Sequence, residues 1–458
     1  MTHRFHPSLL RDYDIRGTVG KTLDAADAWA VGRSFGTIIR RAGGSRVAVG
    51  YDGRLSSPML ESALVEGVAQ SGVDVLRIGL GPTPMLYHAE AVCDVDGAVQ
   101  VTGSHNPRDD NGFKLVLRHA PFFGADITLL GEIAAAGHWI DGAGRVDSIA
   151  MTDRYVDRLV QGFDGPACRI GWDAGNGATG SVIEKLVEHL SGEHHLLFTD
   201  IDGNFPNHHP DPSQDANLDD LRALVRDKRL DFGVAFDGDG DRIGVIDALG
   251  RVIAGDQLTG LFAQDVLQKR PGARIVADVK ASQSLFDRIT DLGGRPDMWK
   301  TGHSHIKSRM KQIGSPLGGE TTGHIFFGDD YYGFDDGLYA AVRLIQVVGT
   351  LGRSVTALRS AMAETVITPE MRFPVADERK FAVIGDVQAR LQMVGADVNM
   401  IDGARVQTDD GWWLLRASNT EAALVSRAES SDAEGLARLI EQIDAQLAQS
   451  GIVRSQNH

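Results

Sequence analysis

Short apolar runs that end in clusters of glycine and polar residues recur along the first three quarters of the chain. Arg46–Tyr51 and Val73–Ile78 are two such runs, and each has the length of a buried strand. Between them, leucine and valine residues recur at helical spacing, and Gly72 follows as a stop signal. This alternation of strands with a helix predicts a largely parallel sheet with right-handed crossovers.

The same pattern begins again twice. Ile170–Gly177 is a strand that runs into a glycine-rich turn, and Arg274–Val279 is a strand that ends at Lys280. Three rounds of similar length indicate an internally repeated α/β unit. We therefore predict three similar consecutive α/β domains with mixed, largely parallel sheets, over residues 1–147, 148–250 and 251–364.

The last part of the chain follows a different pattern. Ser431–Glu434 has the spacing of a capping box and opens a final amphipathic helix. Before it, short runs separated by turn residues predict an antiparallel meander. These runs are Val398–Ile401, Arg405–Thr408, Trp412–Arg416 and Ala422–Ala428. Residues 365–458 are therefore predicted to form an α+β domain, joined to the third domain by a linker around residues 365–374.

Composition restricts the class of protein. The 458 residues are 42% hydrophobic and 24% charged, which is typical of a soluble globular protein with several domains. The formal net charge of −16 argues against nucleic acid or an anionic membrane as the main partner, although a local basic pocket would suit an anionic metabolite. With two cysteines, no signal peptide and no membrane segment in the pattern, we expect a cytoplasmic protein.

Candidate chemistry begins at the loop Thr102–Pro107, which follows a short run with the apolar residues Ala98, Val99 and Val101. Its glycine and asparagine tolerate positive φ, so the loop can turn sharply and hold Ser104 at the carboxyl end of a strand. His105 is next to this hydroxyl, and Lys114 is close in sequence. The same pattern also fits an ordinary polar loop, and only the rest of the chain distinguishes the two.

Three aspartates, Asp237, Asp239 and Asp241, occupy alternate positions directly after a predicted strand. Nearby carboxylates repel one another unless a cation lies between them, so this spacing favours a hard divalent metal over an exposed acidic turn. An EF-hand calcium loop is excluded, because its sixth position would be Arg242 rather than glycine and its twelfth Ala248 rather than glutamate. Arg242 is also placed to contact an anion bound to the metal.

Two further loops carry groups suited to a phosphorylated sugar. Gly318–His324 offers the carboxylate of Glu320, the hydroxyl of Thr322 and an imidazole, which suit sugar hydroxyls and proton transfer. Arg416–Thr420 offers an arginine, hydroxyls, an amide and successive backbone N–H groups, which can form a phosphate cradle. Taken alone, His324 also fits a structural histidine, and the second loop also fits a polar hairpin turn.

Together these loops, in this order, resemble those of the α-D-phosphohexomutase superfamily, and most closely its bacterial phosphomannomutase/phosphoglucomutase branch. Thr102–Pro107 looks like the phosphoserine loop and Asp237–Arg242 like the magnesium loop. Gly319–His324 looks like the sugar-specificity loop and Arg416–Thr420 like the phosphate-binding loop. The resemblance covers the whole chain and implies four domains around a central cleft.

The resemblance also implies a reaction. Ser104 would carry a phosphoryl group, and Mg²⁺ would be held by that group together with Asp237, Asp239 and Asp241. The enzyme would transfer a phosphoryl group reversibly between positions 1 and 6 of a mannose or glucose phosphate. A hexose 1,6-bisphosphate would be the intermediate and activator.

The residues that would line the cleft come from all four domains. Arg242 and Lys114 would supply positive charge to the transferred group, and His105 would orient the serine loop. The proton of the attacking hydroxyl would leave to His324, Lys114 or Arg16, and the sequence leaves this choice open. The expected substrate contacts are Tyr13, Arg16, Lys280, His303, Glu320, Thr322, His324, Arg416, Ser418, Asn419 and Thr420.

The specificity loop departs from the family pattern. Many relatives have serine at the position of Thr322 and a different residue at that of Thr321. Thr322 keeps the hydroxyl, so the sugar contact is expected to survive, while the preferred sugar stays open. The alternatives are a phosphoglucosamine mutase, a sugar phosphatase or a non-catalytic sugar-phosphate sensor. We expect hexose phosphates as ligands, no nucleic acid or membrane partner, and a monomer or weak homo-oligomer.

Overall fold

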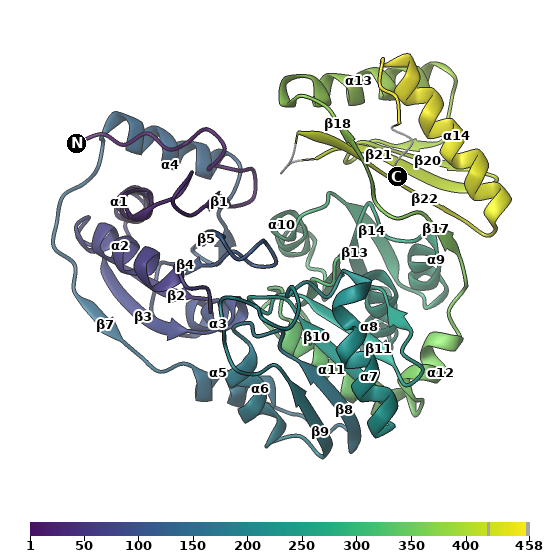
Figure 1. The fold of residues 1–458 in the computed structure, drawn as a ribbon, viewed down its shortest axis with the longest axis horizontal. Coiled ribbons are helices and arrows are strands. Elements are labelled where there is room, and N and C mark those ends of the chain that lie inside the picture. Colours follow the sequence, from purple (N-terminus) through teal and green to yellow (C-terminus); the bar gives the residue numbers. More distant parts are fainter. Residues whose placement is uncertain (419–421, 455–458) are drawn as a thin grey trace.

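The computed structural model describes residues 1–418 and 422–454. Within these ranges, Figure 1 shows four lobes that follow one another along an arc. The N-terminal lobe (purple to blue) is on one side, the C-terminal lobe (yellow-green) is at the top right, and the other two lie between them. We call these lobes domains I to IV and propose the predicted boundaries as their limits.

Domain I is built on a mixed sheet. Its elements are β1 (Ile15–Thr18), α1 (Ala25–Arg41), β2 (Arg46–Tyr51), α2 (Ser57–Ala69), β3 (Asp74–Leu80), α3 (Thr83–Val92), β4 (Gly97–Val101), β5 (Asp110–Leu117), β6 (Ala120–Pro121), α4 (Ala125–Ala136) and β7 (Val146–Ser148). The strand order is β1-β5-β4-β2-β3-β7, with β6 beside β5. Strands β4, β2, β3 and β7 run parallel, whereas β5 is antiparallel to β1, β4 and β6.

Domain II has a smaller sheet of the same kind. Its elements are α5 (Thr152–Leu159), β8 (Cys168–Asp173), α6 (Gly180–Val187), β9 (Gly192–Leu197), the 3₁₀ helix η1 (Asp215–Leu218), α7 (Asp219–Lys228), β10 (Phe232–Phe236), β11 (Ile243–Asp247) and β12 (Val252–Ile253). The strand order is β12-β11-β10-β8-β9, so this sheet extends just past the predicted boundary at residue 250.

Domain III repeats the plan once more. Its elements are α8 (Gly255–Lys269), β13 (Arg274–Asp278), α9 (Gln283–Asp291), β14 (Arg295–Trp299), α10 (His303–Ile313), β15 (Leu317–Gly319), β16 (Ile325–Phe327), α11 (Gly337–Leu351) and α12 (Val355–Ser360). The strand order is β14-β13-β15-β16, and β16 is antiparallel to β15.

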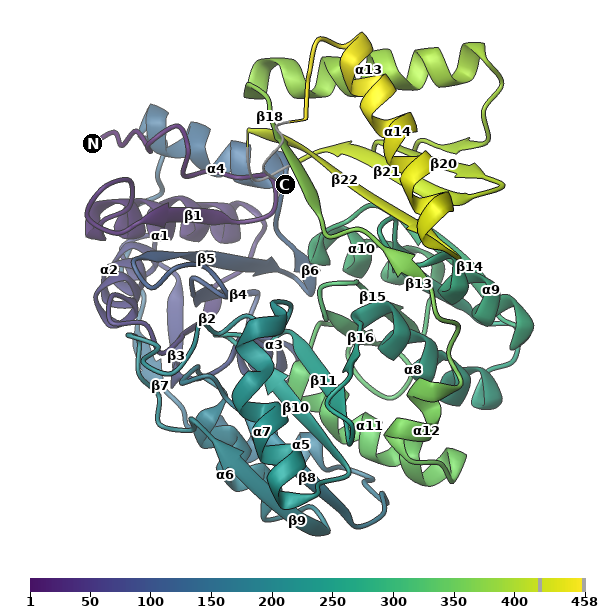
Figure 2. The same ribbon diagram turned by 45° about the vertical axis from the view of Figure 1, so that its right-hand side comes forward.

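Domain IV has an antiparallel sheet. Its elements are β17 (Val366–Ile367), β18 (Met371–Pro374), α13 (Asp377–Met393), β19 (Val398–Asn399), β20 (Ala404–Thr408), β21 (Gly411–Ala417), β22 (Ala423–Ser430) and α14 (Ala433–Gln449). Figure 2 shows β20, β21 and β22 above β13 and β14 of domain III, with α13 and α14 on the far side of the sheet. The predicted fold class, three α/β domains followed by an antiparallel α+β domain, is confirmed.

Three of the predicted functional loops occupy the same place in their domains. Each lies between the last parallel strand and the antiparallel strand that returns beside it: β4 and β5, β10 and β11, β15 and β16. Strands β4 and β10 are buried along their whole length, which explains why they are largely apolar without strict alternation, Gln100 being the polar exception in β4. The repeated unit read from the sequence is therefore a structural repeat that presents one loop per domain.

Two local predictions in the C-terminal part were wrong. The expected linker at residues 365–374 contains β17 and β18, which both pair with β22 and belong to the sheet of domain IV. The last helix is capped by Asp432, whose side chain accepts a 2.7 Å hydrogen bond from the backbone N–H of Gly435, rather than by Ser431. An aspartate and a serine at adjacent positions satisfy the capping pattern almost equally, so the sequence did not separate them.

The hydrophobic cores divide the molecule unequally. One large core contains Trp172 of domain II, Leu285 and Leu344 of domain III, and also residues of α3 in domain I. Domain I has a second core of its own around Phe35. Domain IV is packed around its own core, and among the described residues the apolar contact that joins it to domain III is the small cluster of Val279, Trp412 and Leu414. Domains I to III are thus bound together more extensively than domain IV is bound to them.

Candidate active site

Ser104 sits on a strained turn at the end of β4. Its φ angle is 49°, in the left-handed region that costs a residue with a side chain about 1–3 kcal/mol. The side chain is 2% exposed, and Oγ donates a 3.0 Å hydrogen bond to Asp237 Oδ2 of domain II. On its other side, Oγ is 3.2 Å from His105 Nδ1. The hydroxyl is therefore held between a histidine and the predicted metal loop.

The serine loop is held by Arg54, a residue that the motifs did not single out. This arginine is 1% exposed and donates to the backbone carbonyls of Ser104, Asn106, Pro107 and Asp110 over 2.6–2.8 Å. Asp52 supports the same loop by accepting from the Thr102 hydroxyl. Because these carbonyls have a charged donor, the strained backbone at Ser104 is fixed by the folded structure around it.

Replacing Arg54 with methionine should both destabilise the protein and reduce catalysis. Four carbonyl groups of the serine loop would lose the charged donor that the buried Arg54 provides, which should cost about 3 kcal/mol of unfolding free energy. Because Ser104 would be held less firmly, kcat should fall by about tenfold. This kcat is measured under conditions in which a urea titration shows the variant to be fully folded. Arg33→Met is the matched control, because Arg33 is also a buried arginine of domain I that binds a backbone carbonyl. Equal kcat in both variants would contradict this role.

The three aspartates of the metal loop converge as predicted. Asp237, Asp239 and Asp241 are fully buried, and each places a carboxylate oxygen within 4.8 Å of the others. Lys114 Nζ lies beside Asp239 Oδ2 at 2.7 Å and also contacts Asp241. Asp239 Oδ1 and Asp241 Oδ1 have no hydrogen-bond partner among the described residues. Such an oxygen donor set, with unpaired buried atoms, fits a hard divalent cation such as Mg²⁺.

Charge in this cluster is only partly balanced. Burial, together with repulsion by Asp239 and Asp241, raises the pKa of Asp237 well above its usual range. Burial and Asp239 likewise raise the pKa of Asp241. For Lys114, burial favours the neutral amine, but the carboxylates outweigh burial and raise its pKa above the usual range. The ammonium of Lys114 is therefore stabilised, which argues against Lys114 among the three expected acceptors of the hydroxyl proton.

Metal affinity should therefore rise with pH. The raised pKa values of Asp237 and Asp241 mean that protons compete with the cation, and binding must release them. Affinity should increase as pH rises above the usual range of an aspartate carboxyl and then level off once both carboxyls are ionised. Calorimetric Mg²⁺ titrations in buffers of different ionisation enthalpy would measure both the affinity and the released protons. A flat or falling affinity would contradict the expectation, and Asp237→Asn should release fewer protons.

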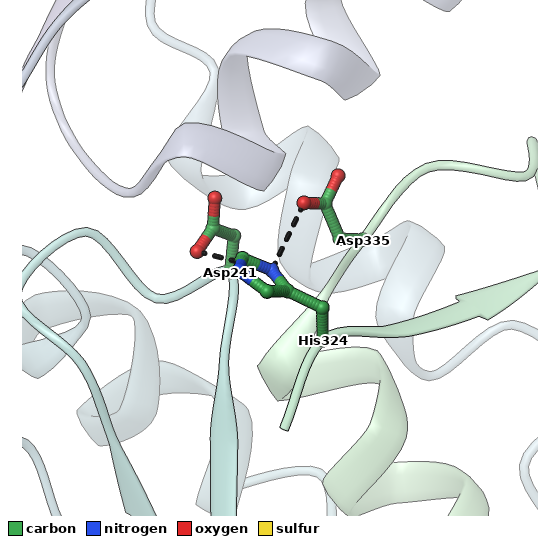
Figure 3. Close-up of side chains that lie close together, drawn as sticks. All are labelled: Asp241, His324 and Asp335. Atoms are coloured by element: carbon green, nitrogen blue, oxygen red, sulfur yellow. Dashed lines mark ion pairs between the residues drawn. The ribbon is translucent and has the colours of Figure 1, made fainter. Parts of the chain in front are cut away.

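His324 connects the metal loop with the sugar loop. Arg242 and His324 form a backbone bridge between domains II and III, and Arg242 Nε donates a 2.9 Å hydrogen bond to His324 Nε2. The other ring nitrogen, Nδ1, faces the carboxylates of Asp241 and Asp335 (Figure 3). His303 stacks on His324 with ring centroids 5.6 Å apart. The two predicted histidines are therefore neighbours, and Asp335 is a further site residue that the motifs did not reveal.

His105 is suited to accept a hydrogen bond as a neutral imidazole rather than to carry a positive charge. Burial, followed by the charges of Arg242, Arg16 and Lys114, holds the pKa of His105 well below its usual range. A neutral imidazole can accept the single hydroxyl hydrogen of Ser104 through Nδ1 as an alternative to Asp237. This geometry agrees with its expected role in orienting the serine.

A second group of predicted residues gathers around the backbone of Thr301 and Gly302. The Tyr13 hydroxyl donates to Thr301 O over 3.1 Å, and Gly302 N donates to Glu320 Oε1 over 2.7 Å. From domain IV, Asp402 Oδ2 accepts from Thr301 N and also from Arg416 Nε. Residues of domains I, III and IV thus meet at one loop.

The remaining predicted residues are placed as follows. Arg16 donates to Asn106 of the serine loop over 2.6 Å. Lys280 is buried near Asp278 and Glu370, at 4.0 and 3.9 Å. Thr322 is half-buried in the sugar loop, and Ser418 is buried at the end of β21. Asn419 and Thr420 lie outside the described residues.

The fold and this site define a class of enzyme. Family models of the phosphoglucomutase/phosphomannomutase alpha/beta/alpha domains I, II and III match residues 7–135, 153–250 and 254–366, and the model of the C-terminal domain matches residues 370–446. The chain belongs to the phosphoglucomutase/phosphomannomutase family and is a phosphohexomutase. The resemblance noted in the sequence is confirmed.

Individual relatives are similar over nearly the whole chain. A phosphomannomutase/phosphoglucomutase of Pseudomonas putida is 45% identical over 429 residues, which cover 93% of each chain. A phosphoglucomutase of Neisseria meningitidis serogroup A is 40% identical and covers 95% of this chain and 96% of its own length. The crystal structure of a phosphoglucomutase/phosphomannomutase family protein from Burkholderia thailandensis, 41% identical, superposes with a TM-score of 0.92 over 98% of each chain. Among the described residues, no helix combines the length and apolar character needed to cross a membrane.

Proposed function

We propose that this phosphohexomutase transfers a phosphoryl group reversibly between positions 1 and 6 of glucose and mannose phosphates, with Ser104 as the carrier. The observation that carries the assignment is the placement of Ser104 Oγ on a strained, buried turn, 3.0 Å from the convergent aspartates of domain II. Strain at a residue with a side chain is typical of functional loops. The names of the relatives reported above support glucose and mannose phosphates as the substrates.

In the forward half-reaction, phospho-Ser104 donates its phosphoryl group to the free hydroxyl of the sugar. The phosphorus–Oγ bond breaks with its electron pair left on Oγ, a bond forms between phosphorus and the sugar oxygen, and the hydroxyl proton passes to His324 Nε2. The hexose 1,6-bisphosphate then turns around and returns its other phosphoryl group to Ser104 by the reverse step. Such transfers depend mainly on positioning and charge neutralisation, which Arg242 and Lys114 supply.

Mg²⁺ is the cofactor that fits the metal loop. Asp237, Asp239 and Asp241 would hold it together with an oxygen of the phosphoserine. When bound, the ion would neutralise charge on the transferred phosphoryl group. The protein's own part is to keep these carboxylates close together, and Lys114 provides a compensating positive charge beside Asp239.

Recognition of the sugar in two orientations needs groups remote from Ser104. Glu320, Thr322 and His303 would contact sugar hydroxyls, while Arg416 and the rest of its loop would bind the phosphate that is not being transferred. Arg416 is pre-oriented by its hydrogen bond to Asp402. Burial would lower the pKa of Arg416, but the charge of Asp402 outweighs burial and raises it. Tyr13, Arg16 and Lys280 complete the proposed set, on a monomeric or weakly associated cytoplasmic enzyme.

A side-by-side measurement of kcat/KM on glucose 1-phosphate, mannose 1-phosphate and glucosamine 1-phosphate tests this assignment. We expect turnover of the first two to exceed that of glucosamine 1-phosphate by at least about tenfold, because the relatives named above are mutases of glucose and mannose phosphates. Preference for glucosamine 1-phosphate would contradict it. Inorganic phosphate released in step with substrate loss would indicate a phosphatase, and binding without turnover would indicate a sensor.

A further inference from the structure

Asp335 is a fully buried aspartate between the two histidines of the site. Its Oδ2 atom is 3.1 Å from His324 Nδ1 and 3.5 Å from His303 Nδ1. Figure 3 shows the ring of His324 between the carboxylates of Asp335 and Asp241. Both carboxylates approach the same nitrogen of the imidazole, Nδ1, and that of Asp335 is the nearer of the two.

The opposite nitrogen of His324 is defined as an acceptor. Arg242 Nε donates to His324 Nε2, and an arginine N–H has no lone pair with which to accept. In the neutral imidazole the proton is therefore on Nδ1, on the side of Asp335. A carboxylate next to Nδ1–H stabilises this tautomer and fixes the orientation of the ring.

We propose that Asp335 is a positioning residue that holds His324 in the Nδ1–H tautomer and so keeps the lone pair on Nε2 for the proton of the attacking sugar hydroxyl. The inference rests on the proposed function, in which His324 is the base. A phosphate bound in the site competes with Nε2 for the guanidinium of Arg242, which frees the lone pair when it is needed. Asp335 acts only through the histidine.

Lys307 keeps Asp335 in the charged form that this task requires. Its ammonium binds Asp335 Oδ1 at 2.8 Å and lies 4.4 Å from the ring centre of Tyr87. Burial would favour the protonated carboxyl, but Lys307 and the histidines hold the pKa of Asp335 well below its usual range. The negative charge beside His324 therefore persists in the interior.

A transition metal is the competing interpretation of the same cluster. Asp241, His324 and Asp335 each place one possible ligand atom within 4.8 Å of the others. A metal would need the lone pair of His324 on Nδ1, which puts the proton on Nε2, directly against the N–H of Arg242. The hydrogen bond from Arg242 therefore favours the tautomer over the metal.

The test compares Asp335→Asn with Asp336→Asn. Asp336 is the adjacent buried aspartate, but it caps α11 through Tyr339 N and accepts from the hydroxyls of Tyr155 and Tyr331. An asparagine at 335 can turn its amide toward His324 and favour the wrong tautomer. We expect kcat to fall by at least about 10²-fold in Asp335→Asn, with KM within about twofold. Asp336→Asn should lower stability and leave kcat of the folded enzyme within about twofold.

A double-variant cycle separates positioning from a structural effect. In the His324→Ala background, Asp335→Asn should cost no further kcat, and an independent loss there would overturn the proposal. If His324→Ala lowers kcat and Asp335→Asn does not, this inference fails and the assignment of His324 as base stands. If His324→Ala keeps full kcat, the positioning role of Asp335 and the assignment of His324 as base both fail.

The tautomer can also be read in the unmodified enzyme, so the test does not depend on a variant that folds. Nitrogen-15 spectra of histidine-labelled protein, assigned with His324→Ala, should show His324 protonated at Nδ1. Protonation at Nε2 would overturn the proposal. The proposal would also be overturned if the native chain bound one equivalent of zinc, added as zinc chloride, and the Asp335→Asn variant did not.

Discussion

Replacing Ser104 with alanine should abolish mutase turnover, with kcat falling by at least about 10⁴-fold. The variant loses the only atom that can carry the phosphoryl group at this position, and neither His105 nor the metal loop offers a substitute nucleophile on the same turn. The carbonyl contacts of Arg54 involve backbone atoms, so they persist and the loop should keep its shape. A coupled assay for glucose 6-phosphate formed from glucose 1-phosphate measures the loss.

Ser71→Ala is the control for this prediction. Ser71 is another fully buried serine of domain I, and its hydroxyl donates to the carbonyl of Arg33, away from the site. This variant should lose some stability and keep its kcat. Intact-mass measurement should find a phosphoryl group on the Ser71 variant and none on the Ser104 variant. Substantial turnover by Ser104→Ala would overturn the phosphoserine mechanism.

Replacing Asp239 with asparagine should lower kcat/KM by about 10³-fold, because loss of one charged ligand removes several kcal/mol of transition-state stabilisation by the metal. Asp239 is fully buried and contacts both Lys114 and the hydroxyl of Thr83. The side chain of asparagine has a similar size, so the change is mainly one of charge. Activity measured over a range of Mg²⁺ concentrations should show a weakened response that excess metal does not fully restore.

Asp265→Asn is the control for the metal loop. Asp265 is a buried aspartate that pairs with Arg343 and Lys269, away from the metal loop. Its replacement should reduce stability and leave the response to Mg²⁺ unchanged. Full activity of the unmodified enzyme after exhaustive treatment with a chelator would show that the cluster of aspartates has a different purpose.

The positions of the functional loops could be predicted from the sequence, because each lies at the end of a strand and carries an unusual density of polar groups. The aspartates at alternate positions converge as their spacing indicates. Their order along the chain also identified the family. The functional residues within the loops were therefore predicted better than the residues that hold the loops in place.

The antiparallel return strands were harder to recognise. Asn111 and Gly112 have the composition of a turn, yet both lie inside β5. A side chain at Gly112 would meet the carbonyl oxygen of Ile15 at 2.0 Å, so glycine is required by the close approach of β1. The sequence shows the glycine but not the neighbouring strand that explains it.

The supporting residues escaped prediction for a related reason. Arg54 follows a strand in an ordinary Asp-Gly-Arg turn, and its partners are backbone carbonyls about fifty positions later. Asp335 touches His324 only because β16 is followed by a turn that brings the chain back across Phe326. Contacts to backbone atoms leave no residue pattern, so only the folded chain reveals them.

The separate core of domain IV has a consequence for how the molecule loses its structure. Domains I to III share apolar packing, whereas among the described residues domain IV packs on domain III through the small apolar cluster of Val279, Trp412 and Leu414. Polar contacts supplement this cluster, such as those of Arg405 with two carbonyls of domain III and of Asp402 with Thr301 N. Regions joined by few apolar contacts open at lower free energy than the whole. Domain IV can therefore melt while the other domains remain folded, and no single melting temperature describes this chain.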